Sequence, residues 1–257
     1  MKVKLITSEN NSTYRLFLEL TKARGIKKHG MAILSGPKQV REVLRDFPER
    51  CAGVILADYH ETPPLPENID ITLYRISKEL YKKIDLFGTK NPVLLLKFNP
   101  FPQWDENVRT PGCTLIAPFQ DPANIGAVIR SSAAFGASMV VLAKETAHPF
   151  NPKSLRAAGS TIFRIPIEEG PSIYKMRITQ TPVITLSPKG KNVMEFEFPP
   201  SFCLVPGMEG PGLPEQLHNK TALSIPMAKG VESLNSAVAA SIVLYLWRNR
   251  SGGLTKN

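Results

Sequence analysis

The feature that most constrains the fold is a repeated alternation of short apolar runs with helical segments after residue 112. Strands that are apolar on both faces and separated by helices are typical of a parallel sheet covered on both sides. The sequence therefore predicts an α/β fold for this part of the chain. The expected strands are residues 114–117, 139–142, 162–165, 183–186, 202–205 and 222–225.

Residues 1–98 show the same alternation on a smaller scale and predict a compact α/β unit of their own. Helical apolar spacing runs through residues 12–24 and 78–86, and another helix opens at Gly36-Pro37, where proline suits a helix start. The strands expected in this unit are residues 31–34, 54–57, 71–74 and 93–96.

Residues 99–112 are rich in turn formers and lack periodicity. Proline restricts the residue before it to extended conformations, so this stretch is interpreted as a linker. We therefore expect a smaller domain at 1–98, a linker at 99–112 and a larger domain at 113–257.

The charge balance favours a polyanionic partner. The chain has 32 Lys and Arg against 22 Asp and Glu, a net charge of +10, which suits nucleic acid or an anionic membrane surface. The longest apolar run, residues 237–247, is too short to span a bilayer, and the start lacks the apolar core of a signal peptide. Three dispersed cysteines and four histidines without ligand spacing indicate a reduced, metal-free cytoplasmic protein.

Three segments combine glycine, proline and isolated polar groups. The first, residues 121–136, places Asn124 and Arg130 at the entrance of a helix otherwise built from small and apolar residues. An isolated surface arginine would be the ordinary interpretation, but the small neighbours and the nearby Asn favour a site. The core face of this helix is expected at Ile125, Val128, Ile129, Ser132 and Phe135.

The other two segments follow later strands. Glu209 is the single carboxylate in a turn with glycines at 207, 210 and 212, and no dinucleotide or P-loop fingerprint occurs in the chain. Downstream, a long helix is expected to begin near Ser233, which suits an N-cap, whereas a structural role explains Asn235 poorly. In open parallel sheets ligands bind beyond the carboxyl ends of the strands, so the three segments predict one shared site.

Basic residues offer candidate phosphate contacts. Lys153 and Arg156 lie one turn apart on an expected helix, where plain solvation is an equally good interpretation. The further candidates for RNA contact are Lys27, Lys28 and Lys38.

Together the three segments resemble the motifs of the SpoU (TrmH-type) family of SPOUT RNA methyltransferases, in the family's order. The first domain more loosely resembles a ribosomal-protein-like RNA-binding domain through residues 34–40. The motif residues are Asp121, Asn124, Gly126, Arg130, Phe135 and Gly136 for the first, Gly207, Glu209 and Gly212 for the second, and Ile225-Pro-Met227 with Ser233-Leu-Asn235 for the third.

The resemblance implies a trefoil-knotted domain, a homodimer, S-adenosylmethionine as methyl donor and a ribose 2′-hydroxyl of RNA as acceptor. Large-subunit rRNA is the preferred substrate and tRNA the alternative. Methylation of a base nitrogen, or an RNA-binding assembly factor without catalysis, are the rival functions. The implied catalytic residues are Asn124, Arg130, Glu209, Ser233 and Asn235, and the implied cofactor-binding residues are Leu186, Gly207, Ile225, Met227 and Leu234.

Two details of the resemblance bear on chemistry. Lys229 stands where the family commonly has glycine, and Ser236-Ala237 replaces the usual Val-Ser or Val-Ala, so the cofactor loop is expected to differ in shape. The family's analogy makes Arg130 a proton acceptor, although arginine is effectively always protonated. Either an RNA phosphate shares the proton, or Arg130 stays charged and stabilises the developing alkoxide.

Overall fold

The computed structural model describes residues 2–67, 69–208 and 213–250, and the structural statements that follow refer to these ranges. The chain divides into two compact units. The first unit comprises residues 1–100 with 148–163, and the second comprises 101–147 with 164–257. The sequence pattern had placed 148–163 in the larger domain, whereas by packing this segment lies with the first unit.

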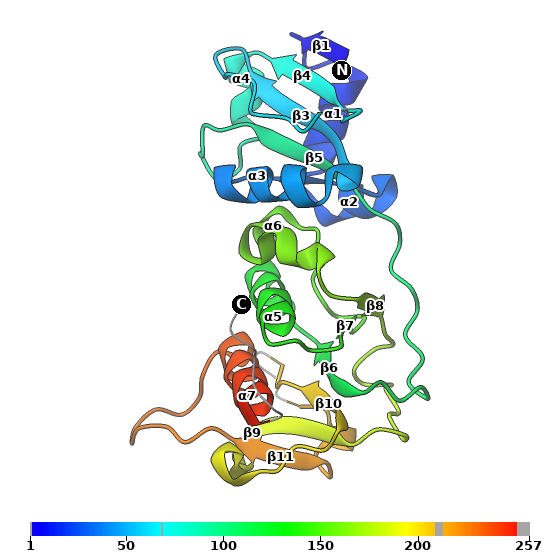
Figure 1. Ribbon diagram of the computed structural model, residues 1–257, viewed down its shortest axis with the longest axis vertical. Coiled ribbons are helices and arrows are strands. Elements are labelled where there is room, and N and C mark those ends of the chain that lie inside the picture. Colours follow the sequence, from blue (N-terminus) through cyan, green and yellow to red (C-terminus); the bar gives the residue numbers. More distant parts are fainter. Residues whose placement is uncertain (1, 68, 209–212, 251–257) are drawn as a thin grey trace. The chain divides into compact units, whose positions relative to one another are not determined.

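The first unit contains a mixed five-stranded sheet in the order β1-β4-β3-β5-β2 (Figure 1). Strand β4 runs parallel to β1 and β3, and β5 runs antiparallel to β3 and β2. The elements are β1 (Lys2–Ile6), α1 (Ser12–Glu19), α2 (Ala23–His29), β2 (Met31–Leu34), α3 (Pro37–Asp46), η1 (Pro48–Arg50), β3 (Cys51–Ala57), β4 (Thr72–Ile76), α4 (Lys78–Lys82), β5 (Val93–Lys97), α6 (Pro152–Ala158) and η2 (Gly159–Phe163).

The helix expected over residues 12–24 is two helices, α1 and α2. Gly25 lies in the first turn of α2, and a Cβ atom there would lie 2.1 Å from the backbone oxygen of Glu19 at the end of α1, so this close packing has room only for glycine. Strand β1 was not predicted, although Lys2-Val-Lys-Leu5 alternates polar and apolar residues. This strand is at the edge of the sheet, and Val3 and Leu5 are exposed on it, so no alternation of buried and exposed residues marks it.

Aromatic side chains attach residues 148–163 to the first unit. The rings of Phe98 and Phe150 stack at 3.9 Å with an interplanar angle of 4°, and those of Phe47 and Phe163 lie 5.2 Å apart. These contacts join the ends of β5 and α3 to the α6–η2 segment. Because they connect positions far apart in the sequence, periodicity alone does not reveal them.

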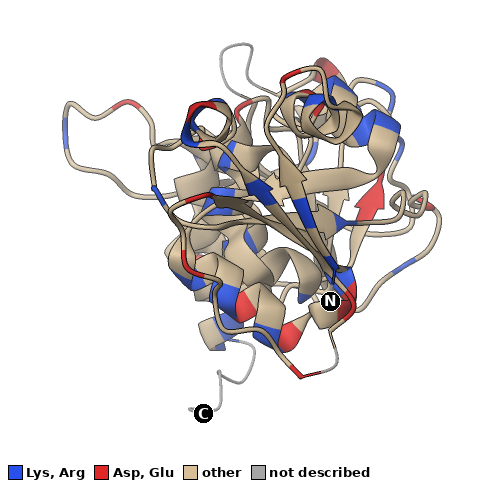
Figure 2. Cartoon of the chain, turned by 90° about the horizontal axis from the view of Figure 1, so that it is seen from above, with Lys and Arg blue, Asp and Glu red and all other residues tan. Residues whose placement is uncertain are grey.

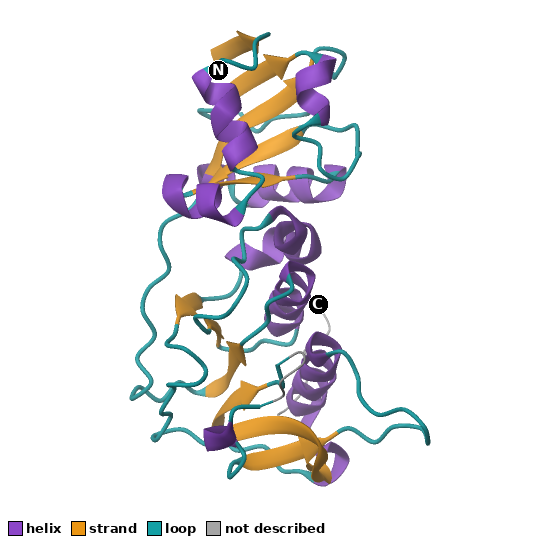
Figure 3. Cartoon of the chain, turned by 180° about the vertical axis from the view of Figure 1, so that it is seen from behind, coloured by secondary structure: helices purple, strands orange, loops and turns teal. Residues whose placement is uncertain are grey.

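The second unit contains a six-stranded sheet in the order β11-β9-β10-β6-β7-β8, and every pair in it is parallel (Figure 3). The predicted parallel α/β sheet is thereby confirmed. Its elements are β6 (Gly112–Ala117), α5 (Pro122–Ala134), β7 (Met139–Leu142), β8 (Ile167–Glu169), β9 (Val183–Asn192), η3 (Val193–Glu195), β10 (Ser201–Val205), η4 (Glu215–Leu217), β11 (Thr221–Ser224) and α7 (Ser236–Arg250).

The strand expected at residues 162–165 was wrong. The chain forms the 3₁₀ helix η2 up to Phe163, and pairing with β7 begins at Pro166, whose carbonyl accepts from the N–H of Val140 at 2.9 Å. The linker also has structure of its own. The backbone N–H of Trp104 donates to the carbonyl of Glu169 at 2.8 Å, so the linker lies along β8 within the second unit.

Positive charge is concentrated in the first unit, which has 19 Lys and Arg against 11 Asp and Glu. It therefore carries +8 of the net +10. Figure 2 shows the Lys and Arg residues of the whole chain spread over helices, strands and loops, interspersed with acidic ones.

The cysteines are placed as inert core residues. Cys51, Cys113 and Cys203 are buried, and burial raises the thiol pKa of Cys51 and Cys203 to about 12 and that of Cys113 well above its usual value. Within the described ranges no three His, Cys, Asp or Glu side chains gather as a metal site, and no helix is long and apolar enough to cross a membrane.

Candidate functional site

The three unusual segments follow three parallel strands of one sheet. Segment 121–136 comes after β6, Gly207 after β10, and Ile225 to Asn235 after β11. Parallel strands end at a common edge, so the topology brings the segments toward each other, as the sequence predicted. Glu209, Gly210 and Gly212 lie outside the described residues.

The start of α5 is built by local capping. The Asp121 side chain accepts from the backbone N–H of Ala123 at 2.9 Å, and Pro122 occupies the first helical turn. This arrangement exposes the first turn, where Asn124 lies. Of the expected core face, Ile125, Val128, Ile129 and Ser132 are buried, while Phe135 is half-buried and packs edge-on against Tyr245.

Two asparagines from distant segments meet at this edge. Asn235 donates from Nδ2 to Oδ1 of Asn124 at 3.1 Å. Its own Oδ1 accepts from the backbone N–H groups of Ala237 and Val238 at 3.0 and 3.1 Å, so Asn235 caps α7. The expectation that Ser233 caps this helix was wrong, because α7 begins only at Ser236.

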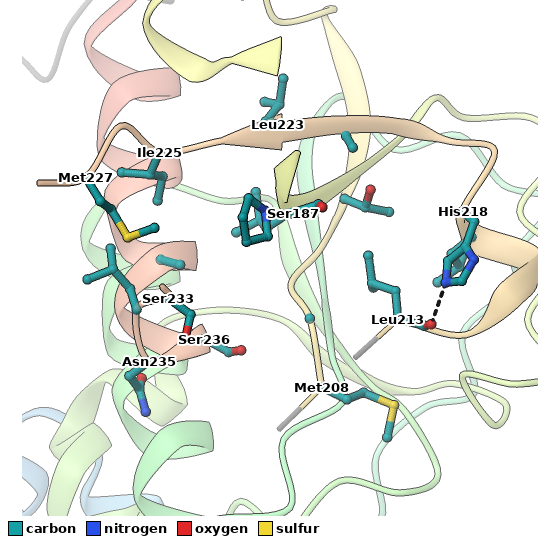
Figure 4. Close-up of a pocket in the computed structure, with 18 residues that line it drawn as sticks. Ser187, Met208, Leu213, His218, Leu223, Ile225, Met227, Ser233, Asn235 and Ser236 are labelled. Carbon is teal, nitrogen blue, oxygen red and sulfur yellow. Dashed lines mark hydrogen bonds between the residues drawn. The ribbon is translucent and has the colours of Figure 1, made fainter. Parts of the chain in front are cut away.

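All five residues expected to hold a cofactor surround one cavity of about 670 Å³. Ile225 and Met227 line one side of it, with Ser233 and Asn235 close by, and Leu213 and His218 lie on the opposite side (Figure 4). The expected residues in its lining are Leu186, Gly207, Ile225, Met227 and Leu234.

His218 is a cavity residue that sequence reasoning missed. Its Nε2 lies 2.9 Å from the carbonyl oxygen of Leu213, which also lines the cavity (Figure 4). For this contact to be a hydrogen bond, Nε2 must carry the proton. No motif marks His218, and its position in the sequence carries no signal.

The cavity depends on an irregular pairing between β9 and β11. Ala222 pairs with Thr185, but the next residue, Leu223, pairs with Lys191, so five residues of β9 have no counterpart on β11. Three of these, Leu186 to Pro188, line the cavity. These unpaired residues of β9 form one wall of the cavity, and the two strands come together again at Gly190.

Ser224 and Gly190 hold β9 against β11 at this point, and sequence reasoning missed both residues. The Ser224 hydroxyl donates to the carbonyl of Gly190 at 2.9 Å. A Cβ at position 190 would lie 2.6 Å from backbone atoms of Ala222 and Leu223, so only glycine permits this approach. A glycine inside a strand was the available signal, because it often marks a bulge or a close backbone contact.

Arg130 stands apart from the cavity. It is exposed on α5 and lines neither this cavity nor the groove described next. The structure therefore joins Asn124 to Asn235 and places Ser233 and Asn235 in one cavity lining, while Arg130 belongs to neither lining.

An apolar groove of about 850 Å³ runs between α5 and α7. Val238 and Tyr245 are 49% and 51% exposed there, and the Ser241 hydroxyl donates to that of Ser131 at 2.7 Å beneath them. Asn124, Asn235 and Ile225 also line the groove, so it adjoins the asparagine pair. The helix residues in its lining are Asn124, Ala127, Ser131, Phe135, Ala237, Val238, Ser241, Ile242, Tyr245 and Leu246.

The basic candidates differ in their surroundings. Lys28 pairs with Glu19 at 3.0 Å, and Lys38 lies 3.9 Å from Glu42. The other three are exposed, and the Arg156 guanidinium lies 4.5 Å from the ring centre of Phe87. For Lys27 and Lys153 the described residues include no carboxylate within ion-pair distance.

Comparison with known proteins adds a family match. The model of the SpoU rRNA Methylase family matches residues 114–245. The "23S rRNA (guanosine(2553)-2′-O)-methyltransferase RlmP" of Bacillus subtilis is 30% identical over 95% of this chain and 98% of its own length.

A relative in Syntrophobacter fumaroxidans, "Ribosomal RNA small subunit methyltransferase G 2", is 45% identical over 98% of this chain. The chain spans only 50% of that relative's length. Among solved structures, an AdoMet-bound rRNA methyltransferase from Sinorhizobium meliloti superposes with a TM-score of 0.78 over 97% of this chain and 98% of its own. At 21% identity this last likeness shows the shared fold.

Proposed function

The chain belongs to the SpoU rRNA methylase family, and from that premise we propose that it transfers the methyl group of S-adenosylmethionine to a ribose 2′-hydroxyl of large-subunit rRNA. The observation that carries the proposal is the hydrogen bond between Asn124, of the first segment, and Asn235, which lines a cavity formed by residues of the second and third segments. The enzymatic activity and the methyl donor follow from the family, and large-subunit rRNA follows from the Bacillus relative's substrate.

The cavity suits this cofactor. Its volume of about 670 Å³ is within the usual range for pockets that enclose small molecules. Leucine, isoleucine and methionine side chains provide apolar walls, and Thr185, Ser187 and Ser233 provide hydroxyls. Residues around Leu186, Gly207, Ile225, Met227 and Leu234 would hold the cofactor.

When bound, S-adenosylmethionine supplies an electrophilic methyl group, and the chain's residues must orient the acceptor oxygen and accommodate its proton. Orientation alone can contribute roughly 7–11 kcal/mol to such a reaction. Asn124 and Asn235, fixed by their mutual hydrogen bond, are placed to orient the ribose at the cavity's edge. We assign Arg130 the stabilisation of the developing alkoxide, because its guanidinium stays charged.

A direct assay tests the activity. The protein is incubated with S-adenosylmethionine labelled in the methyl group and either unmodified rRNA or tRNA, and the modified nucleotide is mapped. A 2′-O-methyl group in large-subunit rRNA is the expected product. A methylated tRNA would change the substrate, and a methylated base nitrogen would overturn the reaction. Failure to bind S-adenosylmethionine would point to an assembly factor.

The apolar groove supports a homodimer as part of this proposal. Exposed Val238 and Tyr245 on α7 and half-buried Phe135 on α5 form a continuous apolar face, which a second copy of the chain would bury. Val238→Asp is expected to yield a monomer in sedimentation experiments. A dimer unaffected by this charge would place the interface elsewhere.

A dimer would also bring Arg130 close to the proposed active site of the partner chain. Arg130 lies one turn of α5 from Ala127, a groove residue, and outside the cavity of its own chain. In a two-fold dimer it would face the partner's site. Mixing inactive Arg130→Ala and Asn235→Ala proteins should then restore about a quarter of the activity, because half of the random dimers regain one intact site. No recovery after exchange of subunits would place Arg130 in its own site.

A further inference from the structure

Two of the five candidate RNA-contacting residues remain available for a partner. Lys28 and Lys38 have carboxylates nearby, and the Arg156 guanidinium packs on the Phe87 ring. Lys27 and Lys153 are exposed, and the described residues place no carboxylate within 4.0 Å of either ammonium group. These two come from different stretches of sequence, yet both belong to the first unit.

Backbone contacts bring their helices to one region. The N–H of Phe98 donates to the carbonyl of Gly30 at 3.0 Å, which fastens the last turn of α2, containing Lys27, to the end of β5. On the other side, the N–H of Asn151 donates to the carbonyl of His148 at 2.9 Å. This turn leads directly into the first turn of α6, where Lys153 lies.

Two partly exposed rings belong to these turns. Phe98 and His148 are half-buried, with ring centres 5.6 Å apart, and buried Phe150 supports both from behind. Burial, together with the charge of Lys27, lowers the pKa of His148 to about 4. The imidazole is therefore neutral at physiological pH.

Partly exposed rings together with lysines that have no carboxylate partner among the described residues have the composition of a surface for single-stranded nucleic acid. Bases stack on aromatic rings, and lysines contact the adjoining phosphates. We propose that Phe98 and His148 stack an unpaired base of the RNA substrate while Lys27 and Lys153 bind the phosphates on either side. This inference rests on the proposed function, because it names how the substrate of that reaction is held.

The charge part is tested by salt dependence. The double variant Lys27→Ala/Lys153→Ala is compared with Lys82→Ala, an exposed lysine on α4, at the end of the first unit's sheet opposite to α2 (Figure 1). The slope of log K against log salt for RNA binding should fall by about 1.4 to 1.8, the value for two lost phosphate contacts. A slope equal to that of Lys82→Ala would overturn the assignment.

The stacking part is tested by Phe98→Leu, which keeps an apolar side chain against Phe150 and removes the aromatic face. RNA affinity should fall about tenfold with little change in the salt slope. Thermal unfolding of the same protein reports any loss of folding. An RNA affinity unchanged from wild type would exclude Phe98 from the interface.

Cofactor binding separates this inference from the proposed function. All variants should bind S-adenosylhomocysteine as the wild type does, because the altered residues lie outside the second unit. If the wild type methylates RNA but the variants bind RNA normally, the surface is wrong and the function stands. If the wild type binds RNA through these residues without methylating it, the surface stands and the function is wrong.

Discussion

At the scale of single residues, Asn235 combines two tasks that sequence reasoning assigned separately. Its side-chain oxygen caps α7, and its amide nitrogen binds Asn124. A serine two residues earlier looked like the better cap, because propensity ranks both residue types alike and cannot choose between neighbouring positions. Because Asn235 caps α7, the position where this helix starts also determines how the side chain of this candidate catalytic residue is oriented.

Substitutions at this position separate the two tasks. Asn235→Ala should lower the free energy of unfolding by about 1 kcal/mol, because the cap is lost, and should also lower methyl transfer about 100-fold. Asn235→Ser keeps a capping hydroxyl but cannot reach Asn124, so it should restore stability without restoring activity. Thermal unfolding and single-turnover rates measure the two effects. Recovery of activity in the serine variant would show that the Asn124 contact is dispensable.

His148 predicts a pH dependence of stability. Its pKa of about 4 in the folded chain is below the usual value of 6.5, so between these pH values the unfolded chain binds more protons. Stability should therefore fall as the pH is lowered from 6.5 to 4, by an amount on the order of 2 kcal/mol. His148→Asn keeps an acceptor for the N–H of Phe150 and removes the titration, so its unfolding free energy should vary less over this range.

At the scale of elements, the irregular pairing of β9 with β11 determines the shape of the cavity proposed to hold the cofactor. The excursion from Leu186 to Gly190 forms one wall, and the strand end at Ile225 forms another. The Ser224 hydroxyl and the bare Gly190 backbone hold the two together. The relative position of the walls therefore rests on atoms that do not contact the cavity.

Substitutions in this closure should act on cofactor affinity. Gly190→Ala forces its new methyl group against the backbone of β11, and the Kd for S-adenosylhomocysteine should rise more than tenfold. Ser224→Ala removes one hydrogen bond and should raise it by about two- to tenfold, with Ser224→Thr restoring it. Calorimetric titration measures each Kd, and an unchanged value for Gly190→Ala would mean that the wall adapts freely.

Sequence patterns predicted the buried parallel strands better than they predicted features that depend on contacts between distant residues. Both faces of β6, β7 and β10 are covered, so each appears as a continuous apolar run. Strand β1 and helix η2 were not predicted. Strand β1 is exposed at an edge of its sheet, and in the η2 region Ile162 and Ile165 are buried without strand pairing. His218 and Ser224 were invisible, since no spacing rule relates them to the cavity that they help to form.

At the scale of the whole molecule, the first unit is assembled from two separate stretches of chain. Residues 148–163 complete its core through the rings of Phe150 and Phe163. Burial of one phenylalanine typically contributes 1.5–3 kcal/mol, so the segment is a substantial share of a small unit's stability.

This division predicts the behaviour of fragments. Residues 1–100 alone should unfold at lower urea concentration than a chain in which a short Gly-Ser linker joins them to residues 148–163, with a difference of about 3 kcal/mol or more. Phe150→Ala in the joined chain provides the control, because it should remove much of the gain. Equal stability of the two fragments would show that residues 1–100 need no second segment.

The two-stretch origin of the first unit also bears on how the protein is made. On a translating ribosome, residues 1–100 emerge well before residue 163, and chain growth proceeds at about 5–20 residues per second. The N-terminal core must therefore wait for some seconds with the Phe98 face uncovered, while the start of the second unit is synthesised. Completion of the proposed RNA-binding surface is thus a late event of its synthesis, because His148 and Lys153 follow Lys27 and Phe98 only after a long interval.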